Sequence, residues 1–476
     1  MLLVAAVLRL LAAIFSQGFL ASDDHHVVIA AADRIASGAG LPTAYARSAV
    51  LPGAIAGIMI VGRFLGIQDP GSQLLLVRLI QAAYSLLVVY FVYRILEQTL
   101  GPDSAQLGGL LAAVFYVMPV TSVHQLEESV CQVPLLAAYW WWIRSETAIS
   151  RLPSAGWGAL AGIAAGLALI LRFPLIGFLA AFVALVLIRP APTRLQGKLA
   201  LLGGLALVIV LQGYSNALIN HEWWFSFTHR LGAMLHPRRM ALDAGDYPSA
   251  PPWHYLLTLL AALIPPASVL LLAAAVKGAS RRAFRLLGIA TLTFLVSHSI
   301  IANKQERFLL PVLPMLFVLI VAGLPWLAAR IARAYRGMWW YFWIVNAALL
   351  VVLMFSSSKK DRVAPLLYIY RRHDATGVLV AQYNETFQVP AYYLGKPQPE
   401  LIVVQHRDEV QTTGVPINYV VLYSDSLEAD RVFLAEALRR PLTLLTVITP
   451  SLTDRLAHAI NPKHNKARTA AVYTIS

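Results

Sequence analysis

Residues 1–26, MLLVAAVLRLLAAIFSQGFLASDDHH, determine how the rest of the chain is interpreted. Residues 1–21 are an apolar stretch that only Arg9 and Gln17 interrupt, and the polar run SDDHH follows at residues 22–26. Charges are costly in hydrocarbon, so carboxylates at the edge of a membrane span are candidates for function. The alternative is a solvated helix end. The stretch therefore predicts a span followed directly by a polar cluster at the membrane surface.

The composition is that of a polytopic membrane protein. Of 476 residues, 58% are hydrophobic and 13% are charged, and the mean hydropathy is +0.65. Soluble domains carry roughly 25% charged residues. Apolar runs recur from residue 1 to residue 356, and residues 1–21 lack the strongly basic start and clean cleavage site of a signal peptide. The single Cys131 excludes an intramolecular disulfide and fits no metal-binding pattern, so no metal or other cofactor is expected.

Much of the net charge of +14 lies in short loops between the apolar runs, where Lys and Arg set orientation, so it does not indicate a nucleic-acid partner. We expect four such loops in the cytoplasm, marked by Arg144 and Arg151, by Arg189, Arg194 and Lys198, by Lys277, Arg281, Arg282 and Arg285, and by Arg330, Arg333 and Arg336. About eleven spans then follow, with the N-terminus inside and the C-terminus outside. These are 3–21, 74–96, 105–121, 129–143, 155–171, 173–188, 199–216, 255–276, 286–301, 308–327 and 338–356.

Two further helices are expected at the membrane surface. Counting residues 50–66 as a span would break the alternation of basic loops, and the stretch is shorter than the ~20 residues that a span needs. It is therefore interpreted as a re-entrant or interfacial helix, and residues 27–37 as a second surface helix.

The composition changes after Ser358. Residues 359–476 contain the strand-like runs VLVAQY, ELIVVQ and YVVLYS and a helix predicted at 427–439, separated by Pro, Gly and Asp turns. The expected fold is a polytopic helical membrane domain over residues 1–358, followed by a small extracytoplasmic α/β domain over residues 359–476.

Polar residues collect in the loops expected outside the membrane. The first contains Asp23, Asp24, His25, His26 and Arg47, the second His124, Glu127 and Glu128, the third His221, Glu222, His229, Arg230, His236, Arg238, Arg239, Trp253 and His254, and the fourth Asn303, Lys304, Gln305, Glu306 and Arg307. Carboxylates can act as a base, and Arg and Lys can hold a phosphate. An outward-facing active site is expected.

Seven short motifs occur in order over about the first two-thirds of the chain. They are Ser22-Asp23-Asp24-His25, Arg47-Ser-Ala-Val-Leu-Pro52, Arg78-Leu-Ile-Gln-Ala-Ala-Tyr-Ser85, His124–Glu128, Leu171-Arg172-Phe-Pro174, Pro252-Trp253-His254-Tyr255 and Asn303-Lys304-Gln305-Glu306-Arg307-Phe308-Leu-Leu-Pro311. Together they resemble glycosyltransferase family 22 of the GT-C superfamily, which includes the mannosyltransferases of N-glycan and GPI-anchor assembly. Asn303 and Gln305 replace a His and a Glu of the family motif, and His25 replaces a Glu.

The resemblance implies a GT-C fold and an enzyme that passes a sugar from a polyprenyl phosphate to a hydroxyl of a lipid-linked glycan or other acceptor. A phosphate leaving group needs charge neutralisation more than a proton, so no metal is required. The acceptor hydroxyl needs a base, and a carboxylate beside imidazoles and apolar walls can have its pKa raised toward neutrality. By motif position the base is Asp24, with Asp23 as the second candidate.

The resemblance also suggests roles for other residues. Glu127, Glu128 and His25 would form a second acidic, acceptor-side group; Arg307, Lys304 and Arg47 would bind donor phosphate, with Arg230, Arg238 and Arg239 as alternatives; Trp253, His254 and His229 would line the site. Each has a structural alternative. Asp24 could cap a surface helix, the two glutamates could be helix-terminal charges, the basic residues could be boundary charges, and Trp253 could be an interface anchor. Arg172 is either a structural ion-pair partner or a ligand of lipid phosphate.

Two other classes of function stay open. A transporter would also need many spans and buried charge, but it should show internal repeats and polar residues near the bilayer midplane. A different GT-C enzyme could add an aminosugar, arabinose or glucose, or act on protein. The short N-terminus and compact size favour a bacterial inner membrane with the site facing the periplasm.

Overall fold

Helices form most of the chain before residue 371, and strands are concentrated after it. The computed structural model describes residues 1–189, 195–235, 249–383, 387–412, 416–424, 426–462 and 465–475. Contacts between residues divide the chain into two compact units. The first comprises Met1–Leu10, Leu41–Leu51 and Gln81–Val351, and the second comprises Leu11–Gly40, Pro52–Ile80 and Val352–Ser476. This division does not follow residue 358, and the functional division there stays a prediction.

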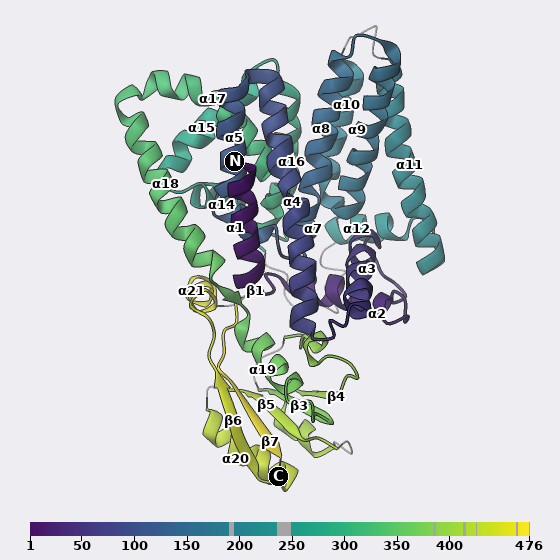
Figure 1. The fold of residues 1–476 in the computed structure, drawn as a ribbon, viewed down its shortest axis with the longest axis vertical. Helices are drawn as coiled ribbons and strands as arrows, with labels where there is room; N and C mark the ends of the chain where they lie inside the picture. Colours follow the sequence, from purple (N-terminus) through teal and green to yellow (C-terminus); the bar gives the residue numbers. More distant parts are fainter. Residues whose placement is uncertain are drawn as a thin grey trace. The chain divides into compact units, whose positions relative to one another are not determined.

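The first unit is a helical bundle in which α8, α9, α10 and α11 can be followed as neighbours in Figure 1. Its helices are α5 (Pro102–Val114), α6 (Val117–Thr121), α7 (Glu127–Val130), α8 (Gln132–Thr147), α9 (Arg151–Leu171), η2 (Phe173–Leu175), α10 (Ile176–Ile188), α11 (Leu195–Asn220), α12 (Phe225–Leu235), α14 (His254–Ala262), α15 (Ala267–Ser280), α16 (Arg285–Ile300), η4 (Glu306–Val312) and α17 (Leu313–Arg330). Among the described residues, four more helices have residues in both units: α1 (Leu2–Phe15), α3 (Val50–Phe64), α4 (Pro70–Leu100) and α18 (Ala332–Met354).

The apolar helices are those of an integral membrane protein. Within the described residues, five helices are long and apolar enough to cross a membrane: Pro70–Leu100, Arg151–Leu171, Leu195–Asn220, Glu306–Arg330 and Ala332–Met354. Shorter apolar helices cover Leu2–Phe15, Val50–Phe64, Phe173–Ile188 and Arg285–Ile300. All eleven predicted spans contain helix, but several of these helices are shorter than a full crossing requires.

The predicted span 255–276 is not one straight helix. α14 and α15 meet at 111°, and Ile264-Pro265-Pro266 lies between them. Proline has no N–H to donate and its ring clashes with the preceding turn, so two consecutive prolines end α14 and allow α15 to start in a new direction. The expectation of an uninterrupted span is corrected to a bent pair, which is a sixth membrane-crossing candidate if the pair counts as one span.

Glycines bring α9 and α11 into close contact. A Cβ on Gly158 would lie 2.3 Å from the carbonyl oxygen of Gly197, and a Cβ on Gly162 would lie 2.0 Å from that of Leu201. Both distances are shorter than any side chain tolerates, so only glycine fits. The spacing of Gly158 and Gly162 in the sequence predicts such packing, because small residues four apart let membrane helices approach each other closely.

The second unit combines surface helices with a β-sheet. Its elements are β1 (Gln17–Gly18), η1 (Asp24–Ile29), α2 (Ala30–Ala36), most of α3 (Val50–Phe64), β2 (Ser357–Ser358), α19 (Lys360–Tyr370), β3 (Gly377–Gln382), η5 (Ala391–Leu394), β4 (Glu400–Val404), η6 (Arg407–Thr412), β5 (Tyr419–Tyr423), α20 (Leu427–Leu438), β6 (Leu442–Ile448), α21 (Leu452–Ile460) and β7 (Ala470–Ile475). The helices predicted at 27–37 and 50–66 correspond to η1 with α2, and to α3.

The sheet has five strands in the order β4-β3-β5-β7-β6. β4, β3 and β5 are parallel, whereas β7 runs antiparallel to both of its neighbours, β5 and β6. Every residue of β3 and β5 is buried, as expected for central strands with covered faces. Leu434 of α20 packs against them in a core with Leu379, Val420 and Leu422. The three strand-like runs of the sequence are β3, β4 and β5.

A two-residue parallel pairing joins distant parts of the second unit. Gln17 pairs with Ser357 and Gly18 with Ser358. Gly18 has a positive φ of +80°, and a Cβ there would lie 1.8 Å from the carbonyl oxygen of Ser358. Glycine is therefore required at this position both by its backbone conformation and by the close approach of the second strand.

Candidate active site

The short helix α7 places two glutamates side by side in the first unit. Glu127 and Glu128 form its first turn, and their side chains are only 5% and 2% exposed. Negative charge suits a helix N-terminus, so the structural alternative for the pair agrees with their position. Four residues make a weak helix, however, and stabilising two buried carboxylates requires partners of opposite charge.

Three arginines supply those charges. Arg47 Nη1 lies 3.2 Å from Glu127 Oε2, and Arg172 Nη2 lies 3.1 Å from Glu128 Oε1. Arg172 Nη1 also lies 3.8 Å from Glu127 Oε2, and Arg307 Nε lies 3.5 Å from Glu128 Oε1. We call these five residues the acid–arginine cluster. Three positive and two negative charges leave it with a net charge of +1.

The cluster keeps Glu128 ionised. Burial pushes the pKa of Glu128 upward, but the guanidinium groups of Arg172 and Arg307 outweigh burial, and the pKa lies below its ordinary value. A carboxylate with a lowered pKa is a poor general base near neutral pH. Glu128 is therefore suited to holding arginines in place rather than to accepting a proton.

Arg172 and Arg307 share an aromatic neighbour. The guanidinium carbon of Arg172 lies 4.7 Å from the ring centre of Phe308, and that of Arg307 lies 5.6 Å from it. Arg307 Nε also donates to Gln305 Oε1 at 2.7 Å. Arg172 is only 6% exposed while Arg307 is 15% exposed, so Arg307 is the more accessible of the two cations. The ion-pair alternative for Arg172 is what the structure shows.

Lys304 lies outside the cluster in a helix-capping position. Its ammonium donates to the carbonyl oxygens of His298 at 3.3 Å and Ser299 at 3.0 Å, and also to that of Ile301. These carbonyls are at the C-terminal end of α16, where a lysine satisfies unpaired acceptors. An ammonium has three N–H donors, and these three carbonyls use all of them. No donor of Lys304 is therefore left for the predicted contact with phosphate.

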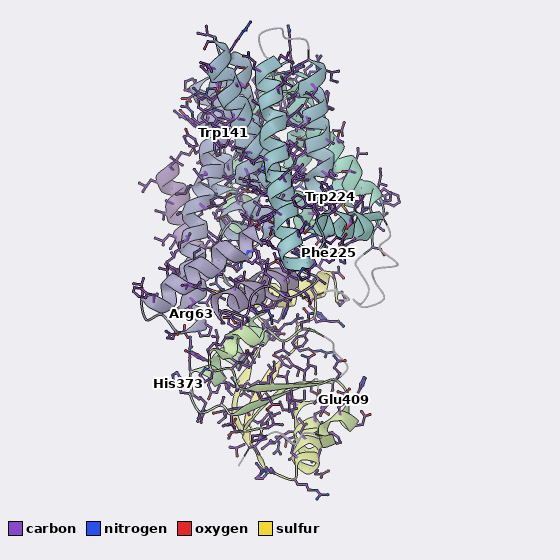
Figure 2. All side chains as sticks on the ribbon, turned by 90° about the vertical axis from the view of Figure 1, so that its right-hand side faces the viewer. Arg63, Trp141, Trp224, Phe225, His373 and Glu409 are labelled. Atoms are coloured by element: carbon purple, nitrogen blue, oxygen red, sulfur yellow. The ribbon has the colours of Figure 1, made fainter. Side chains whose placement is uncertain are left out.

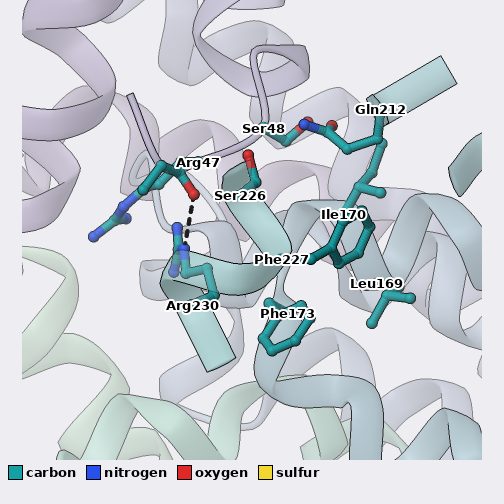
Figure 3. Close-up of a pocket in the computed structure, with 10 residues that line it drawn as sticks. Arg47, Ser48, Leu169, Ile170, Phe173, Gln212, Ser226, Phe227 and Arg230 are labelled. Atoms are coloured by element: carbon teal, nitrogen blue, oxygen red, sulfur yellow. Dashed lines mark hydrogen bonds between the residues drawn. The ribbon is translucent and has the colours of Figure 1, made fainter. Parts of the chain in front are cut away.

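A narrow pocket adjoins Arg47 (Figure 3). Arg47 and Arg230 lie on one side of the view and the apolar Leu169, Ile170 and Phe173 on the other. Arg230 Nε donates to the carbonyl oxygen of Ala46 at 3.1 Å. Since Arg47 also pairs with Glu127, the pocket and the acid–arginine cluster share a residue. The remaining lining residues are Ala46, Ser48, Gln212, Ser226 and Phe227.

A buried polar network from α11 and α12 supports this pocket. Gln212 Nε2 donates to Asn216 Oδ1 at 3.0 Å, and the Ser226 hydroxyl donates to the same oxygen at 2.5 Å. Trp224 and Phe225 lie where the chain enters α12 (Figure 2). Our sequence analysis missed this network. Gln212 and Asn216 are four residues apart within the predicted span 199–216, and that spacing could have revealed it.

The predicted lining residues occupy other positions in the first unit. Trp253 is 62% exposed, as an interface anchor would be. His254 is partly buried and its ring lies 5.6 Å from that of Tyr255. His229 is exposed and stacks on Phe225, although its neighbour Arg230 does line the pocket. The alternative phosphate ligands Arg238 and Arg239, with His236, lie outside the described residues.

Asp24 lies in the second unit, at the start of the π-helix η1. Its side chain is 2% exposed, and Oδ2 accepts a hydrogen bond from the backbone N–H of Ala21 at 3.0 Å. Asp23 is the partly exposed N-cap residue and makes no side-chain capping bond to the helix. Asp24 therefore lies within the first turn rather than at the cap. Single-turn π-helices are frequent at functional sites.

Aromatic rings surround the residue next to Asp24. His25 stacks on Tyr393 with ring centres 5.1 Å apart and planes 11° apart, and its ring lies 5.2 Å from that of Phe19. Burial lowers the pKa of His25 to about 3 and that of His26 to about 4. Both imidazoles are consequently neutral at physiological pH. Neutral imidazoles add no positive charge beside Asp24.

Lys359 provides a cation in this region. Its ammonium donates to the carbonyl oxygen of Leu20 at 2.9 Å and lies 5.2 Å from the ring centre of Phe19. Burial and the positive charge of Arg362 lower the pKa of Lys359 to about 8, although the negative charge of Asp24 acts in the opposite direction. The sequence analysis did not include Lys359, because 335 positions separate it from Asp24.

The structure thus gathers the sequence candidates into two groups. In the first unit Glu127, Glu128, Arg47, Arg172 and Arg307 meet, all of them named from the sequence. Asp24 and His25 lie together in the second unit, with Tyr393 and Lys359 added. Each group contains a charged or buried polar centre with aromatic walls, which is suited to binding a phosphate or a sugar hydroxyl.

Comparisons with known proteins address the fold and the family. The chain is similar to the crystal structure of ArnT from Cupriavidus metallidurans bound to undecaprenyl phosphate, with a TM-score of 0.63 and 13% identity over 99% of this chain and 97% of that one. The apo structure of the same enzyme gives a TM-score of 0.64 at 15% identity and the same coverage. The Archaeoglobus fulgidus oligosaccharyltransferase gives a TM-score of 0.51 at 12% identity, over 93% of this chain and 72% of that one.

These neighbours are GT-C enzymes, so the predicted GT-C resemblance is confirmed. No curated protein sequence matches the chain. The family model described as the Alg9-like mannosyltransferase family matches residues 1–386, which is most of the chain and includes all seven motifs. The chain therefore belongs to the Alg9-like mannosyltransferase family of membrane glycosyltransferases.

Proposed function

We propose that this protein transfers mannose from a polyprenyl-phosphate donor to a hydroxyl of a lipid-linked glycan or another acceptor on the extracytoplasmic side of the membrane. The family supports mannose as the sugar. A structural neighbour bound to undecaprenyl phosphate supports a polyprenyl-phosphate donor. The observation that carries the proposal is the acid–arginine cluster, a group of five charged residues with a net positive charge, of which Glu127, Glu128 and Arg172 are buried.

An excess positive charge is what a phosphate leaving group needs. As the bond between the anomeric carbon and the phosphate oxygen breaks, the electron pair stays on that oxygen, and negative charge grows on the polyprenyl phosphate. Arg307 is the cation that we assign to this charge, because its side chain is the more accessible and a guanidinium can hold two phosphate oxygens at once. Glu128 orients Arg307, and Arg47 is a second ligand candidate.

The acceptor hydroxyl needs a base. In the proposed reaction the acceptor oxygen bonds to the anomeric carbon while its proton passes to Asp24, and one displacement inverts the anomeric centre. Asp24 suits this role because it is buried, has a defined rotamer fixed by the Ala21 N–H, and sits beside aromatic rings. Its partly exposed neighbour Asp23 is the second candidate.

The deciding experiment uses the purified full chain in lipid nanodiscs with polyprenyl-phosphate mannose labelled in the sugar. The proposal expects loss of label from the donor and its recovery in an acceptor glycolipid extracted from the producing membrane. A panel of donors that carry glucose, arabinose or an aminosugar tests the alternative GT-C substrates in the same assay. If no donor is consumed, the enzyme proposal fails, and movement of a labelled lipid between leaflets becomes the assay for the transporter alternative.

A further inference from the structure

A second pocket lies entirely within the second unit and has a volume of about 320 Å³. α2, the end of α3, the start of α4, and η5 with the segment after it contribute to its walls. The sequence motifs do not include its charged residues, and the proposed sugar transfer does not use them. The residues that line it are Asp33, Ser37, Arg63, Gln68, Pro70, Gln73, Tyr392, Gly395, Lys396 and Gln398.

Two cations in this pocket share one carboxylate. Arg63 Nη2 lies 2.5 Å from Asp33 Oδ1, and Lys396 Nζ lies 3.2 Å from Asp33 Oδ2. Each carboxylate oxygen therefore has one cation, and the three side chains leave a net charge of +1. Arg63 Nη1 also donates to the Ser37 hydroxyl at 3.3 Å. These contacts hold the guanidinium in place before any ligand binds, which lowers the entropic cost of binding.

The neutral side chains of the pocket are fixed by hydrogen bonds to neighbouring groups. Gln73 Nε2 donates to the carbonyl oxygen of Ile67 at 2.9 Å, and Gln73 Oε1 accepts from the Tyr392 hydroxyl at 3.1 Å. Gln68 Nε2 donates to the carbonyl oxygen of Arg63 at 3.4 Å. The amide donors are thus largely used within the protein. The charged donors for an incoming anion are those of the two cations.

Lys396 has donors to spare. Its side chain is 50% exposed, and an ammonium carries three N–H groups, of which the contact with Asp33 occupies one. A lysine ammonium held at one point and open to solvent is well placed to reach a second anion. A tetrahedral phosphate group can then accept from Lys396 and Arg63 together.

The residues beside Arg63 are suited to contact with a membrane surface. Phe64 is 90% exposed and Leu65 is 67% exposed, and Ile60 and Val61 on the same helix are also exposed. A short helix with exposed apolar residues and a basic end is typical of an interfacial helix, which is the role predicted for residues 50–66. In such a helix the arginine side chain extends to the level of lipid phosphates. Figure 2 labels Arg63.

We propose that this pocket binds a phosphate ester through Arg63 and Lys396, with Asp33 holding the two cations in position. The phosphate can belong to the headgroup of a membrane lipid or to a soluble phosphate ester. The proposal does not depend on sugar transfer, so the failure of either leaves the other standing.

The test is a binding titration with the purified full chain in non-ionic detergent. The probes are dihexanoyl phosphatidylglycerol, zwitterionic dihexanoyl phosphatidylcholine and glycerol 3-phosphate. Lys396→Gln and Arg63→Gln should each weaken binding of the anionic probe by about tenfold or more, since each removes a charge-assisted hydrogen bond. Arg440→Gln makes the same charge change in the second unit at an exposed residue outside this pocket and should have no effect.

Asp33→Asn separates a binding site from a structural ion-pair network. The amide oxygen of Asn can still accept a hydrogen bond from Arg63, so the guanidinium stays in position while a repulsive negative charge is removed. If the pocket binds phosphate, the affinity should therefore rise several-fold. Stronger binding by this variant, with weaker binding by Lys396→Gln, supports the proposal, and Lys396 is exposed enough for its variant to fold.

If the protein binds dihexanoyl phosphatidylglycerol but not glycerol 3-phosphate, the ligand is a lipid headgroup. If it binds both equally, the phosphate ester alone is sufficient for binding. The proposal is overturned if the unmodified protein binds neither anionic probe. It is also overturned if Lys396→Gln and Arg63→Gln bind as the unmodified protein does, or if Asp33→Asn weakens binding.

Discussion

Arg172 Nη2 lies 3.1 Å from Glu128 Oε1, and neither side chain is more than 6% exposed. Arg172 follows α9 directly, whereas Glu128 lies in α7, so the pair connects two segments of the first unit. A buried ion pair adds little stability over a well-packed apolar pair, but the loss of one partner leaves an uncompensated buried charge. Replacing one member of this ion pair should therefore destabilise the protein more than replacing both members together.

We accordingly expect Arg172→Met to lower the free energy of unfolding by about 3–5 kcal/mol. The double variant Arg172→Met with Glu128→Gln should recover part of that loss, since the unpaired charge is removed. Arg94→Met is the control, because the Arg94–Glu97 pair is roughly one-third exposed on both sides and such pairs contribute about 0–1 kcal/mol. Denaturant or thermal unfolding in detergent measures all three. Equal destabilisation by Arg172→Met and Arg94→Met would contradict the expectation.

Arg307→Ala should weaken use of the polyprenyl-phosphate donor. Loss of a charge-assisted hydrogen bond costs on the order of 1.5–3 kcal/mol, and Lys at this position should recover only part of it, because an ammonium lacks the planar fork of a guanidinium. The measurement is the donor concentration dependence of transfer by folded protein in nanodiscs. Unchanged donor affinity and turnover would move the phosphate-binding role to Arg47 or Arg230, which lie together at the pocket of Figure 3.

Asp24→Asn should abolish nearly all transfer while the protein still inserts and binds donor. The amide oxygen of Asn can accept the Ala21 N–H as Asp24 does, so the local fold should survive. A positioned base contributes about 10²–10⁴-fold in rate. Asp23→Asn, made in parallel, should lose less.

If Asp23→Asn is inactive and Asp24→Asn is active, the enzyme proposal stands with the neighbouring carboxylate as base. If both variants keep full transfer, neither is the base, and the role passes to Glu127, since the lowered pKa of Glu128 makes that residue less suited to it.

Acid should destabilise the second unit through His25. Burial lowers the pKa of His25 from 6.5 to about 3, so between these values the unfolded chain binds a proton that the folded chain does not. The free energy of unfolding is therefore highest above pH 6.5 and decreases as the pH falls below that value. The decrease is about 2 kcal/mol at pH 5, because each pH unit below the unfolded pKa costs about 1.4 kcal/mol.

His25→Phe keeps an aromatic ring on Tyr393 and removes the titrating group. The difference in melting temperature between pH 7 and pH 5 should therefore shrink in this variant, while His373→Phe, at an exposed site, should keep the difference of the unmodified protein. A pH dependence that is the same in all three proteins would show that His25 does not carry it.

Residues 359–476 should face away from the cytoplasm. This expectation rests on the alternation of basic loops and on the interpretation of residues 50–66 as a surface helix. A reporter that is active only outside the cytoplasm, attached after Ser476, should give a signal, and a cytoplasmic reporter at the same position should not. The reverse result would place every proposed catalytic loop on the other side of the membrane.

Local patterns predicted much of the fold. The apolar runs correspond to helices, and VLVAQY and YVVLYS correspond to β3 and β5, because β-branched residues in short runs favour buried strands. The break at Pro265 and Pro266 was also present in the sequence, and the predicted span 255–276 ignored it. Lys304 follows the end of a predicted helix by three residues, so its capping position could have been expected from the preference for basic residues there.

Tertiary contacts could not be predicted in the same way. The partnership of Arg172 with Glu128 joins residues 44 positions apart, and the stacking of His25 on Tyr393 joins residues 368 positions apart. A single sequence carries no record of such pairs, since their identity depends on how helices and loops pack. The motif residues, Arg172 among them, were therefore recognisable as candidates, while the pairing of Arg172 with Glu128 and the partners Tyr393 and Lys359 were not predicted.

The pairing of Gln17 and Gly18 with Ser357 and Ser358 has a consequence for biosynthesis. Asp24 is six residues beyond Gly18, so the segment that carries the proposed base begins at this pairing. The partner strand is translated about 340 residues later. During translation the first helix can enter the membrane early, yet the loop after it cannot acquire its final path until residue 358 has emerged. A nascent chain that stalls before that point would hold its N-terminal helix in the bilayer with the loop unfinished.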